Sequence, residues 1–279
     1  MKLSNWQHQF IATHGLASDY VVALNPLLPK LTPQTVPFCL GISGSQGCGK
    51  STLAAYVAAY FEYELKLNTS VISLDDYYLS KQERAEKAAQ EHLLFATRGV
   101  PGTHDLAALV DDIQSLLAGH ETAIRRFNKA LDEPFEQPET VGKGMQCVII
   151  EGWCLAVPAQ QTSALVMPIN AFEKTHDKDT SFRQRVNQYL AEYKTLTTLI
   201  NKLVFINSQD FSRVLKWRTK QEHQLIARTG KGMTDAEIAE FICYFERITR
   251  HSFACMPALS DITLNLSDTH TIEGIVEQI

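Results

Sequence analysis

The chain has 279 residues, of which 45% are hydrophobic and 20% are charged, and its net charge is −5. This composition is typical of a globular protein with a sizeable core, and the acidic balance argues against broad attraction to nucleic acid or an anionic membrane. Residues 1–15 contain no continuous apolar segment, and no run of about 18 apolar residues occurs in the chain. We therefore expect no secretion signal, no membrane span and no nucleic-acid partner.

The six cysteines are spread along the chain without a Cys-x-x-Cys pair. This spacing favours reduced thiols in a cytoplasmic protein over a disulfide framework or a zinc site. No repeat, low-complexity tract or linker divides the chain. We expect a single domain over residues 1–279, present as a monomer or a homodimer.

The first predicted elements lead into a glycine-rich segment. Residues 5–30 have apolar positions at mixed helical spacing, so residues 1–36 are expected to form an N-terminal helical extension. Residues 36–43 form a short apolar run that predicts a buried strand. Residues 50–65 are rich in helix formers and lack Gly and Pro, which predicts a helix. Residues 69–76, TSVISLDD, predict a second strand that ends in two carboxylates.

Strands and helices continue to alternate along the rest of the chain. Further strands are predicted over 146–152, 201–208 and 260–267, and helices over 81–96, 105–118, 181–200, 210–228 and 234–249. Short apolar strands that alternate with helices pair in parallel through right-handed crossovers. The sequence therefore predicts an α/β fold with a three-layer, doubly wound parallel sheet, whose ligands bind at the carboxyl ends of the strands.

The segment GISGSQGCGKST, residues 41–52, has the spacing of a phosphate-binding loop, with a strand before it and a helix after it. Its glycines let backbone N–H groups wrap a phosphate, and the helix adds its positive N-terminal end. Lys50 is predicted to bridge the β- and γ-phosphates, and the Ser51 hydroxyl to bind Mg²⁺. The expected nucleotide contacts are Gly44, Ser45, Gln46, Gly47, Cys48, Gly49, Lys50, Ser51 and Thr52.

Three carboxylates lie at predicted strand ends near this loop. Glu151, near the end of the strand CVIIEG, reaches Mg²⁺ directly or through a water, polarises the substrate side, or is a surface carboxylate. Asp75 and Asp76 are adjacent in the predicted strand and point to opposite faces, so they cannot share one role. One of them suits a proton acceptor for an attacking hydroxyl, and the alternative is a turn or a helix cap.

The loop RGVPGTHD, residues 98–105, carries Arg98, His104 and Asp105. These side chains suit ligand binding, although Asp105 is equally suited to cap the next helix and His104 to pack in the core.

Residues 124–132, IRRFNKALD, contain a basic cluster that includes Arg126 and Lys129. Asn128 and Lys129 resemble the start of a guanine-reading Asn-Lys-x-Asp motif, but Asp132 lies one position too late. A switch GTPase is therefore disfavoured, and the cluster better suits an anionic or polyol substrate.

Basic residues also recur along the helix predicted over 210–228, which is followed by Gly230 and Gly232. They are Arg213, Lys216, Arg218 and Arg228. A cationic helix joined to a glycine hinge is suited to close over a triphosphate as a lid, and the alternative is a solvated basic face with a glycine cap.

The order of these motifs resembles the phosphoribulokinase/uridine kinase/pantothenate kinase branch of P-loop small-molecule kinases, and within it D-glycerate 3-kinase and its kinase-like relatives. The resemblance extends from about residue 37 to residue 245 and rests on GISGSQGCGKST, ISLDDYYL, RGVPGTHD, RFNKALD, VIIEGW and KWRTKQEH…GKGM. It implies a P-loop kinase fold with a helical lid, ATP and Mg²⁺ as cofactors, and transfer of the γ-phosphate to a hydroxyl of a small metabolite, D-glycerate first.

The same resemblance implies roles for single residues. Asp75 becomes the base and Asp76 its support, arginines of the lid helix lie near the γ-phosphate, and Lys50 and Arg218 act in catalysis. Residues 76–105 and 213–232 become the substrate and lid segments. The implied substrate contacts are Asp76, Tyr78, Arg98, His104, Asp105, Arg126 and Lys129.

Two departures from the pattern lie on the presumed acceptor side. Residues 156–158 read AVP where glycerate kinases tend to have a Gly–aromatic pair, and residues 241–253 lack a Pro-Ala-Tyr-like ending. An acceptor similar to uridine, pantothenate or ribulose phosphate therefore remains an alternative to glycerate. A regulatory protein switched by ATP remains the alternative to a kinase.

Overall fold

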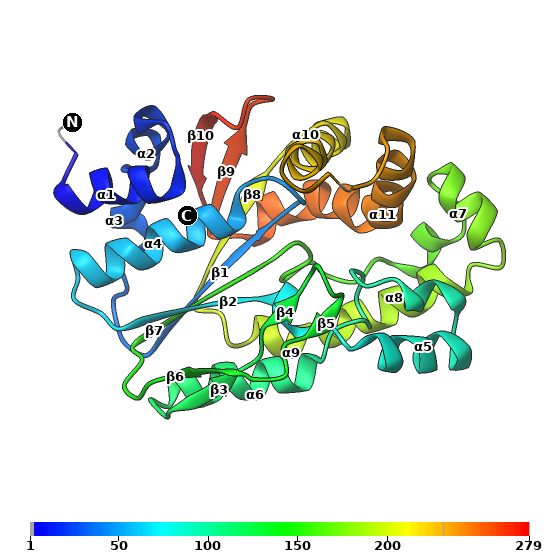
Figure 1. Cartoon of the computed structure of the whole chain (residues 1–279), viewed down its shortest axis with the longest axis horizontal. Helices are drawn as coiled ribbons and strands as arrows, with labels where there is room; N and C mark the ends of the chain where they lie inside the picture. Colours follow the sequence, from blue (N-terminus) through cyan, green and yellow to red (C-terminus); the bar gives the residue numbers. More distant parts are fainter. Residues whose placement is uncertain (1–2, 231, 279) are drawn as a thin grey trace.

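The computed structural model describes residues 3–230 and 232–278. Within them lies a six-stranded sheet in the order β10-β9-β8-β1-β7-β2, with helices on both faces (Figure 1). All neighbouring strands of this sheet pair in parallel except β10, which is antiparallel to β9. The strands are β1 (Phe38–Gly44), β2 (Thr69–Ser73), β7 (Cys147–Gly152), β8 (Lys202–Asn207), β9 (Ile262–Leu266) and β10 (Ile272–Glu277).

The sheet separates two hydrophobic cores, because successive residues of a strand point to opposite faces. Leu40 and Ile42 of β1 pack in one core, and Cys39 packs in the other. Helices cover both faces, as a parallel sheet requires. The first core is covered by α1 (Asn5–His14), α2 (Ser18–Leu24), α3 (Leu28–Leu31) and α4 (Lys50–Tyr63), and the second by α6 (Leu106–Leu117), α8 (Ser181–Glu192), α9 (Lys194–Thr197) and α11 (Asp235–Leu259). The predicted three-layer, doubly wound α/β fold is confirmed.

Helices α1 to α3 form the predicted N-terminal extension and share a core with α4. The ring of Phe10 lies 5.1 Å from the ring of Tyr56, and the Gln7 amide donates a hydrogen bond to the Tyr56 hydroxyl at 2.6 Å. The extension therefore buries one face of the helix that follows the glycine-rich loop.

The edge strand β10 is the antiparallel exception in the predicted parallel sheet. Strand β10 was not predicted, because Ile272–Glu277 carries two glutamates and a glycine and is partly exposed. Helix α11 also continues to Leu259, ten residues beyond the predicted end at 249. The helix predicted over 81–96 ends at Gln90 in α5 (Lys81–Gln90), and the turn η2 (Leu93–Ala96) follows.

Short elements bring distant segments to the carboxyl end of the sheet. The turn η1 (Leu74–Tyr77) follows β2, and two small hairpins lie between α6 and β7. The hairpins pair β3 (Thr122–Ile124) with β6 (Glu139–Val141) and β4 (Phe127–Asn128) with β5 (Glu133–Pro134). Among the residues described, no helix has both the length and the apolar character needed to cross a membrane.

Candidate active site

The glycine-rich loop, residues 44–49, connects β1 to the N-terminus of α4. A Cβ atom at Gly44 would lie 2.8 Å from the Sγ atom of Cys48 and 2.9 Å from the carbonyl oxygen of Ile206, so only glycine fits there. Gly49 has a φ of 93°, in the left-handed region that favours glycine, directly before α4. The loop and the positive end of α4 together form a site suited to a phosphate group.

The Lys50 side chain folds back onto this loop and donates a hydrogen bond to the Ser45 carbonyl oxygen at 3.0 Å. Burial alone would lower the pKa of this ammonium group. Cys48, Glu151 and Asp75 raise that pKa above its ordinary value instead. The Lys50 side chain therefore stays positively charged between the loop and the two carboxylates.

Glu151 is the residue before the last of β7, which lies between β1 and β2, and only 6% of the surface of Glu151 is exposed. Its Oε1 atom accepts hydrogen bonds from Ser51 Oγ at 2.8 Å and from Ser73 Oγ at 3.0 Å. A carboxylate and two hydroxyls are oxygen donors of the kind that Mg²⁺ prefers, so these residues fit a magnesium ion beside a phosphate. Ser73 was missed from the sequence, and its place at the end of β2, opposite Glu151, is the signal for it.

Asp75 lies in the turn η1 and not at a strand end as predicted, because β2 ends at Ser73. The Ser73 hydroxyl accepts a hydrogen bond from the Asp75 N–H at 3.3 Å and so caps the turn. One Asp75 oxygen accepts a hydrogen bond from the Tyr78 hydroxyl at 2.8 Å, and the other from Lys129 Nζ at 2.7 Å.

Opposing effects set the charge of Asp75. Burial raises its pKa, but the charge and hydrogen bond of Lys129, the charge of Lys50 and the hydrogen bond of Tyr78 lower it to about 2. The carboxylate is therefore ionised at neutral pH.

Asp76 has partners different from those of Asp75. Its carboxylate accepts hydrogen bonds from Arg126 at 2.8 Å and from the Phe127 N–H at 3.3 Å. Arg126 also donates to Glu139 at 2.7 Å. The two aspartates are thus separated as the sequence suggests, although a turn and not a strand separates them. Asp76 ties the hairpin segment to η1.

His104 is buried beside the Asp75 turn. Its ring stacks on Tyr78 at 4.5 Å, and its Nδ1 atom lies 2.6 Å from the Tyr193 hydroxyl. Burial lowers the pKa of His104 to about 4, so the ring is neutral at pH 7. Its Nε2 atom is buried without a partner among the described residues. Tyr193, which orients this ring, was missed from the sequence because it lies about 90 residues farther along the chain.

Arg98 and Asp105 both have partners within the chain. Arg98 forms an ion pair with Asp132, which also pairs with Arg84 at 2.6 Å. One Asp105 oxygen accepts a hydrogen bond from the N–H of residue 108 in α6, and the other pairs with Arg125 at 2.6 Å. The capping role considered for Asp105 is therefore present.

The predicted lid helix is α10 (Phe211–Thr229), which residues 230–234 join to α11. Arg218 pairs with Glu222 at 2.7 Å, and the Glu222 side chain is only 3% exposed. Glu222 also accepts a hydrogen bond from the Met233 N–H at 2.9 Å. Arg218 is thus linked to the connection that follows its own helix. The side chain of Arg228 lies outside the described part.

The β9–β10 turn joins α10 to the glycine-rich loop, a contact that the sequence does not reveal. Arg213 pairs with Asp268 at 2.5 Å. The Trp217 ring stacks on His270 at 4.1 Å, and His270 Nε2 lies 2.8 Å from the Gly47 carbonyl oxygen. The loop, α10 and this turn are therefore in direct contact.

Comparison with known proteins places the chain among kinases, although no family model matches it. It is 33% identical over 227 residues to the uncharacterized kinase mug58 of Schizosaccharomyces pombe, covering 76% of this chain and 80% of that protein. It is 28% identical over 222 residues to the chloroplastic D-glycerate 3-kinase of Arabidopsis thaliana, covering 74% of this chain and 45% of that protein. Among solved structures, D-glycerate 3-kinase from Cryptococcus neoformans matches with a TM-score of 0.75 at 23% identity, over 97% of this chain and 99% of that one.

The sequence match to the S. pombe kinase extends far beyond the glycine-rich loop. The chain belongs to the P-loop kinases related to D-glycerate 3-kinase. It is an ATP-dependent phosphotransferase that acts on a small substrate. The resemblance seen in the motifs is thereby confirmed, and the structural match confirms the P-loop kinase fold.

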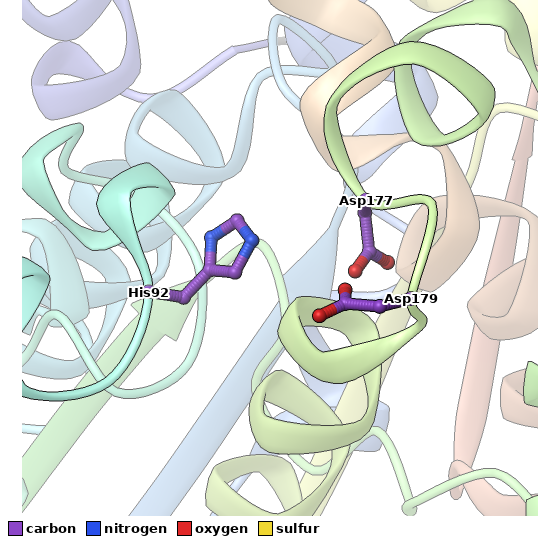
Figure 2. A group of neighbouring side chains, drawn as sticks. All are labelled: His92, Asp177 and Asp179. Atoms are coloured by element: carbon purple, nitrogen blue, oxygen red, sulfur yellow. The ribbon is translucent and has the colours of Figure 1, made fainter.

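This P-loop kinase has another group of potential metal ligands. Figure 2 shows His92, Asp177 and Asp179 facing one another, with their ligand atoms within 4.8 Å. Asp177 pairs with Arg183 at 2.7 Å, and Asp179 accepts a hydrogen bond from the Ser181 N–H at 3.2 Å. Both carboxylates thus stabilise the start of α8, which accounts for their position without a metal ion.

Proposed function

We propose that this P-loop kinase transfers the γ-phosphate of ATP to a hydroxyl group of a small metabolite, with D-glycerate as the first candidate acceptor. The observation that carries the proposal is the ionised carboxylate of Asp75, which lies close enough to Lys50 for each to shift the pKa of the other. A base beside the phosphate-binding lysine is placed where an acceptor hydroxyl has to approach. The name of the Arabidopsis relative supports glycerate as the acceptor.

In the proposed reaction, the backbone N–H groups of the loop and Lys50 hold the phosphates. The acceptor oxygen bonds to the γ-phosphorus, the bond from that phosphorus to the β–γ bridging oxygen breaks, and ADP leaves. The hydroxyl proton passes to Asp75. Positioning and charge neutralisation supply most of the rate enhancement, since phosphoryl transfer needs little covalent chemistry from the protein. The assigned nucleotide contacts are Gly44, Ser45, Gln46, Gly47, Cys48, Gly49, Lys50, Ser51 and Thr52.

Ser51 and Glu151 would hold the magnesium ion that accompanies ATP. Bound there, the ion neutralises negative charge on the phosphate oxygens. The hydrogen bond from Ser73 orients the Glu151 carboxylate for this role.

Residues 76–105 and 213–232 contribute the acceptor side and the lid in this proposal. Tyr78 holds the Asp75 carboxylate in place, and Arg218 would bring positive charge to the transferring phosphoryl group once it leaves Glu222. The residues assigned to the acceptor side are Asp76, Tyr78, Arg98, His104, Asp105, Arg126 and Lys129.

An acceptor screen tests the proposal. ADP release is measured with ATP and Mg²⁺ in the presence of D-glycerate, uridine, pantothenate or neutral polyols, and the product is identified by mass spectrometry and NMR. We expect D-glycerate to stimulate ADP release and to appear as its phosphate ester. If no hydroxyl compound stimulates ADP release while ATP alters binding of a protein partner, the chain is a nucleotide switch and the proposal is wrong.

A further inference from the structure

Lys129 covers the carboxylate that the proposed reaction uses as its base. Its Nζ atom lies 2.7 Å from Oδ2 of Asp75, while the Tyr78 hydroxyl occupies Oδ1 at 2.8 Å. Both carboxylate oxygens are engaged before an acceptor arrives. A hydroxyl that approaches Oδ2 therefore competes with the Lys129 ammonium group.

The backbone of Lys129 is fixed, whereas its side chain is accessible. Lys129 lies in the turn between β4 and β5, where the Asn128 side chain accepts hydrogen bonds from the N–H groups of Ala130 and Leu131, each at 3.1 Å. The Lys129 side chain is 58% exposed. An exposed ion pair is weak in water. An incoming anion can therefore replace Asp75 as the partner of the Lys129 ammonium group with a small loss of free energy.

The neighbouring cations are more strongly committed. The guanidinium of Arg98 pairs with Asp132, which also neutralises the buried side chain of Arg84. Arg126 bridges two carboxylates, those of Asp76 and Glu139. Removing either arginine from its partners leaves charges without compensation. Lys129 is therefore more readily recruited than Arg98 or Arg126.

We propose that the acceptor is an anion whose carboxylate draws Lys129 away from Asp75, so that substrate binding itself uncovers the base. This inference rests on the proposed kinase function and assigns to Lys129 the recognition of the acceptor carboxylate. The acceptor hydroxyl takes the place of the ammonium group at Oδ2, and Lys129 keeps its proton throughout. A neutral polyol leaves the ion pair intact and is a poor acceptor.

The electrostatics of Asp75 fit this exchange. Lys129 is the largest of the groups that lower the pKa of Asp75, and burial acts in the opposite direction. When Lys129 moves to the acceptor, Oδ2 of Asp75 becomes free to accept a hydrogen bond from the acceptor hydroxyl. The neutral ring of His104 stacks on Tyr78, and its buried Nε2 atom has no hydrogen-bond partner within the described part of the chain.

The test compares D-glycerate with glyceramide, in which an uncharged amide replaces the carboxylate. kcat and kcat/KM are measured for both acceptors with the wild type, Lys129→Ala and Lys129→Arg, and with Lys143→Ala, an exposed lysine in the loop before β7, as the control. The wild type and the control should prefer glycerate by about 10- to 100-fold, the range of one charge-assisted hydrogen bond. Lys129→Arg should keep most of this preference.

Lys129→Ala should lose most of the preference for glycerate over glyceramide, through opposite changes with the two acceptors. Its kcat/KM for glycerate falls, while its kcat for glyceramide rises, because the base is no longer covered. Calorimetry without ATP should also show weaker binding of glycerate to this variant and unchanged binding to Lys143→Ala.

Several results separate the inference from the proposed function. An unchanged preference in Lys129→Ala, or equal losses with both acceptors, overturns the inference, because the lysine then acts only on the shape of the site. If the wild type phosphorylates glyceramide as fast as glycerate, the proposed kinase function holds and the displacement of Lys129 by the acceptor carboxylate is wrong. If the wild type phosphorylates no hydroxyl compound, the proposed function fails and the inference fails with it.

Discussion

Replacement of Asp75 by asparagine should abolish most turnover while ATP binding persists. The amide keeps the size of the side chain and an oxygen that can accept the hydrogen bond from Tyr78, but it cannot accept the proton of an acceptor hydroxyl. A positioned general base contributes about 10²- to 10⁴-fold to a rate. We therefore expect kcat to fall by this factor, which corresponds to about 3–5 kcal/mol in the activation barrier.

The same structure predicts a small effect of Asp75→Asn on nucleotide affinity. The lost ion pair with Lys129 is exposed on the lysine side and stabilises the fold by about 0–1 kcal/mol. Lys50 keeps its hydrogen bond to the Ser45 carbonyl oxygen, so the phosphate loop retains its cation. The Kd for ATP should therefore change by less than about fivefold.

The assay follows ADP release at saturating ATP and acceptor, and calorimetry gives the Kd for ATP. Asp111→Asn is the matched control, because Asp111 is an exposed carboxylate on α6. A kcat for Asp75→Asn within about threefold of the wild type refutes the role of base. A loss of ATP affinity as large as the loss of turnover would instead make Asp75 part of the nucleotide site.

Other substitutions examine the metal ligands, the loop and the buried histidine. Glu151→Gln should raise the Mg²⁺ concentration for half-maximal activity about tenfold or more, and an unchanged Mg²⁺ titration would contradict the assignment. Gly44→Ala should lower the melting temperature and abolish ATP binding, since its Cβ atom would meet the Ile206 carbonyl oxygen at 2.9 Å; calorimetry showing normal binding would count against this. The pKa of His104 is lowered by burial to about 4. A histidine in the unfolded chain has a pKa of about 6.5. The stability that His104 contributes is therefore present above that pH and is lost as the pH falls towards 4. Between pH 7 and pH 5, the free energy of unfolding measured by urea denaturation should fall by about 2 kcal/mol more for the wild type than for His104→Gln. The same fall in both proteins would contradict the burial argument.

The central strands of the sheet were predictable because burial on both faces demands continuous apolar runs. Strand β1 is buried at every position, and the sequence FCLGISG reflects this. The edge strand β10 lacks such a run because one side of it faces solvent. Strands β3 to β6 contain only two or three residues each, too few for any periodicity to appear.

The geometry of the glycine-rich loop was predictable because its residues are contiguous and its shape depends on glycine. Residues that join the site through tertiary contacts were not predictable in this way. Ser73 reaches Glu151 only through the pairing of β2 with β7, and His270 reaches Gly47 only through the fold of the C-terminal hairpin. The turn at Asp75 was considered only as an alternative, because the sequence TSVISLDD is typical of a strand up to its last residue.

Six basic residues in the segments assigned to the acceptor side and lid are paired with carboxylates in the described part of the chain, which the sequence does not reveal. The pairs are Lys129–Asp75, Arg98–Asp132, Arg125–Asp105, Arg126–Asp76, Arg213–Asp268 and Arg218–Glu222.

In a chain with a net charge of −5, an anionic substrate therefore has to exchange partners with these pairs. The cost of each exchange depends on burial. The Lys129 side chain is 58% exposed and the Arg218 side chain 22%, while its partner Glu222 is only 3% exposed. Freeing Lys129 leaves a carboxylate that can serve as a base, whereas freeing Arg218 leaves a buried carboxylate without compensation. We therefore expect the acceptor to recruit Lys129 readily, and the lid arginine to leave Glu222 only when the full charge of the triphosphate replaces that partner.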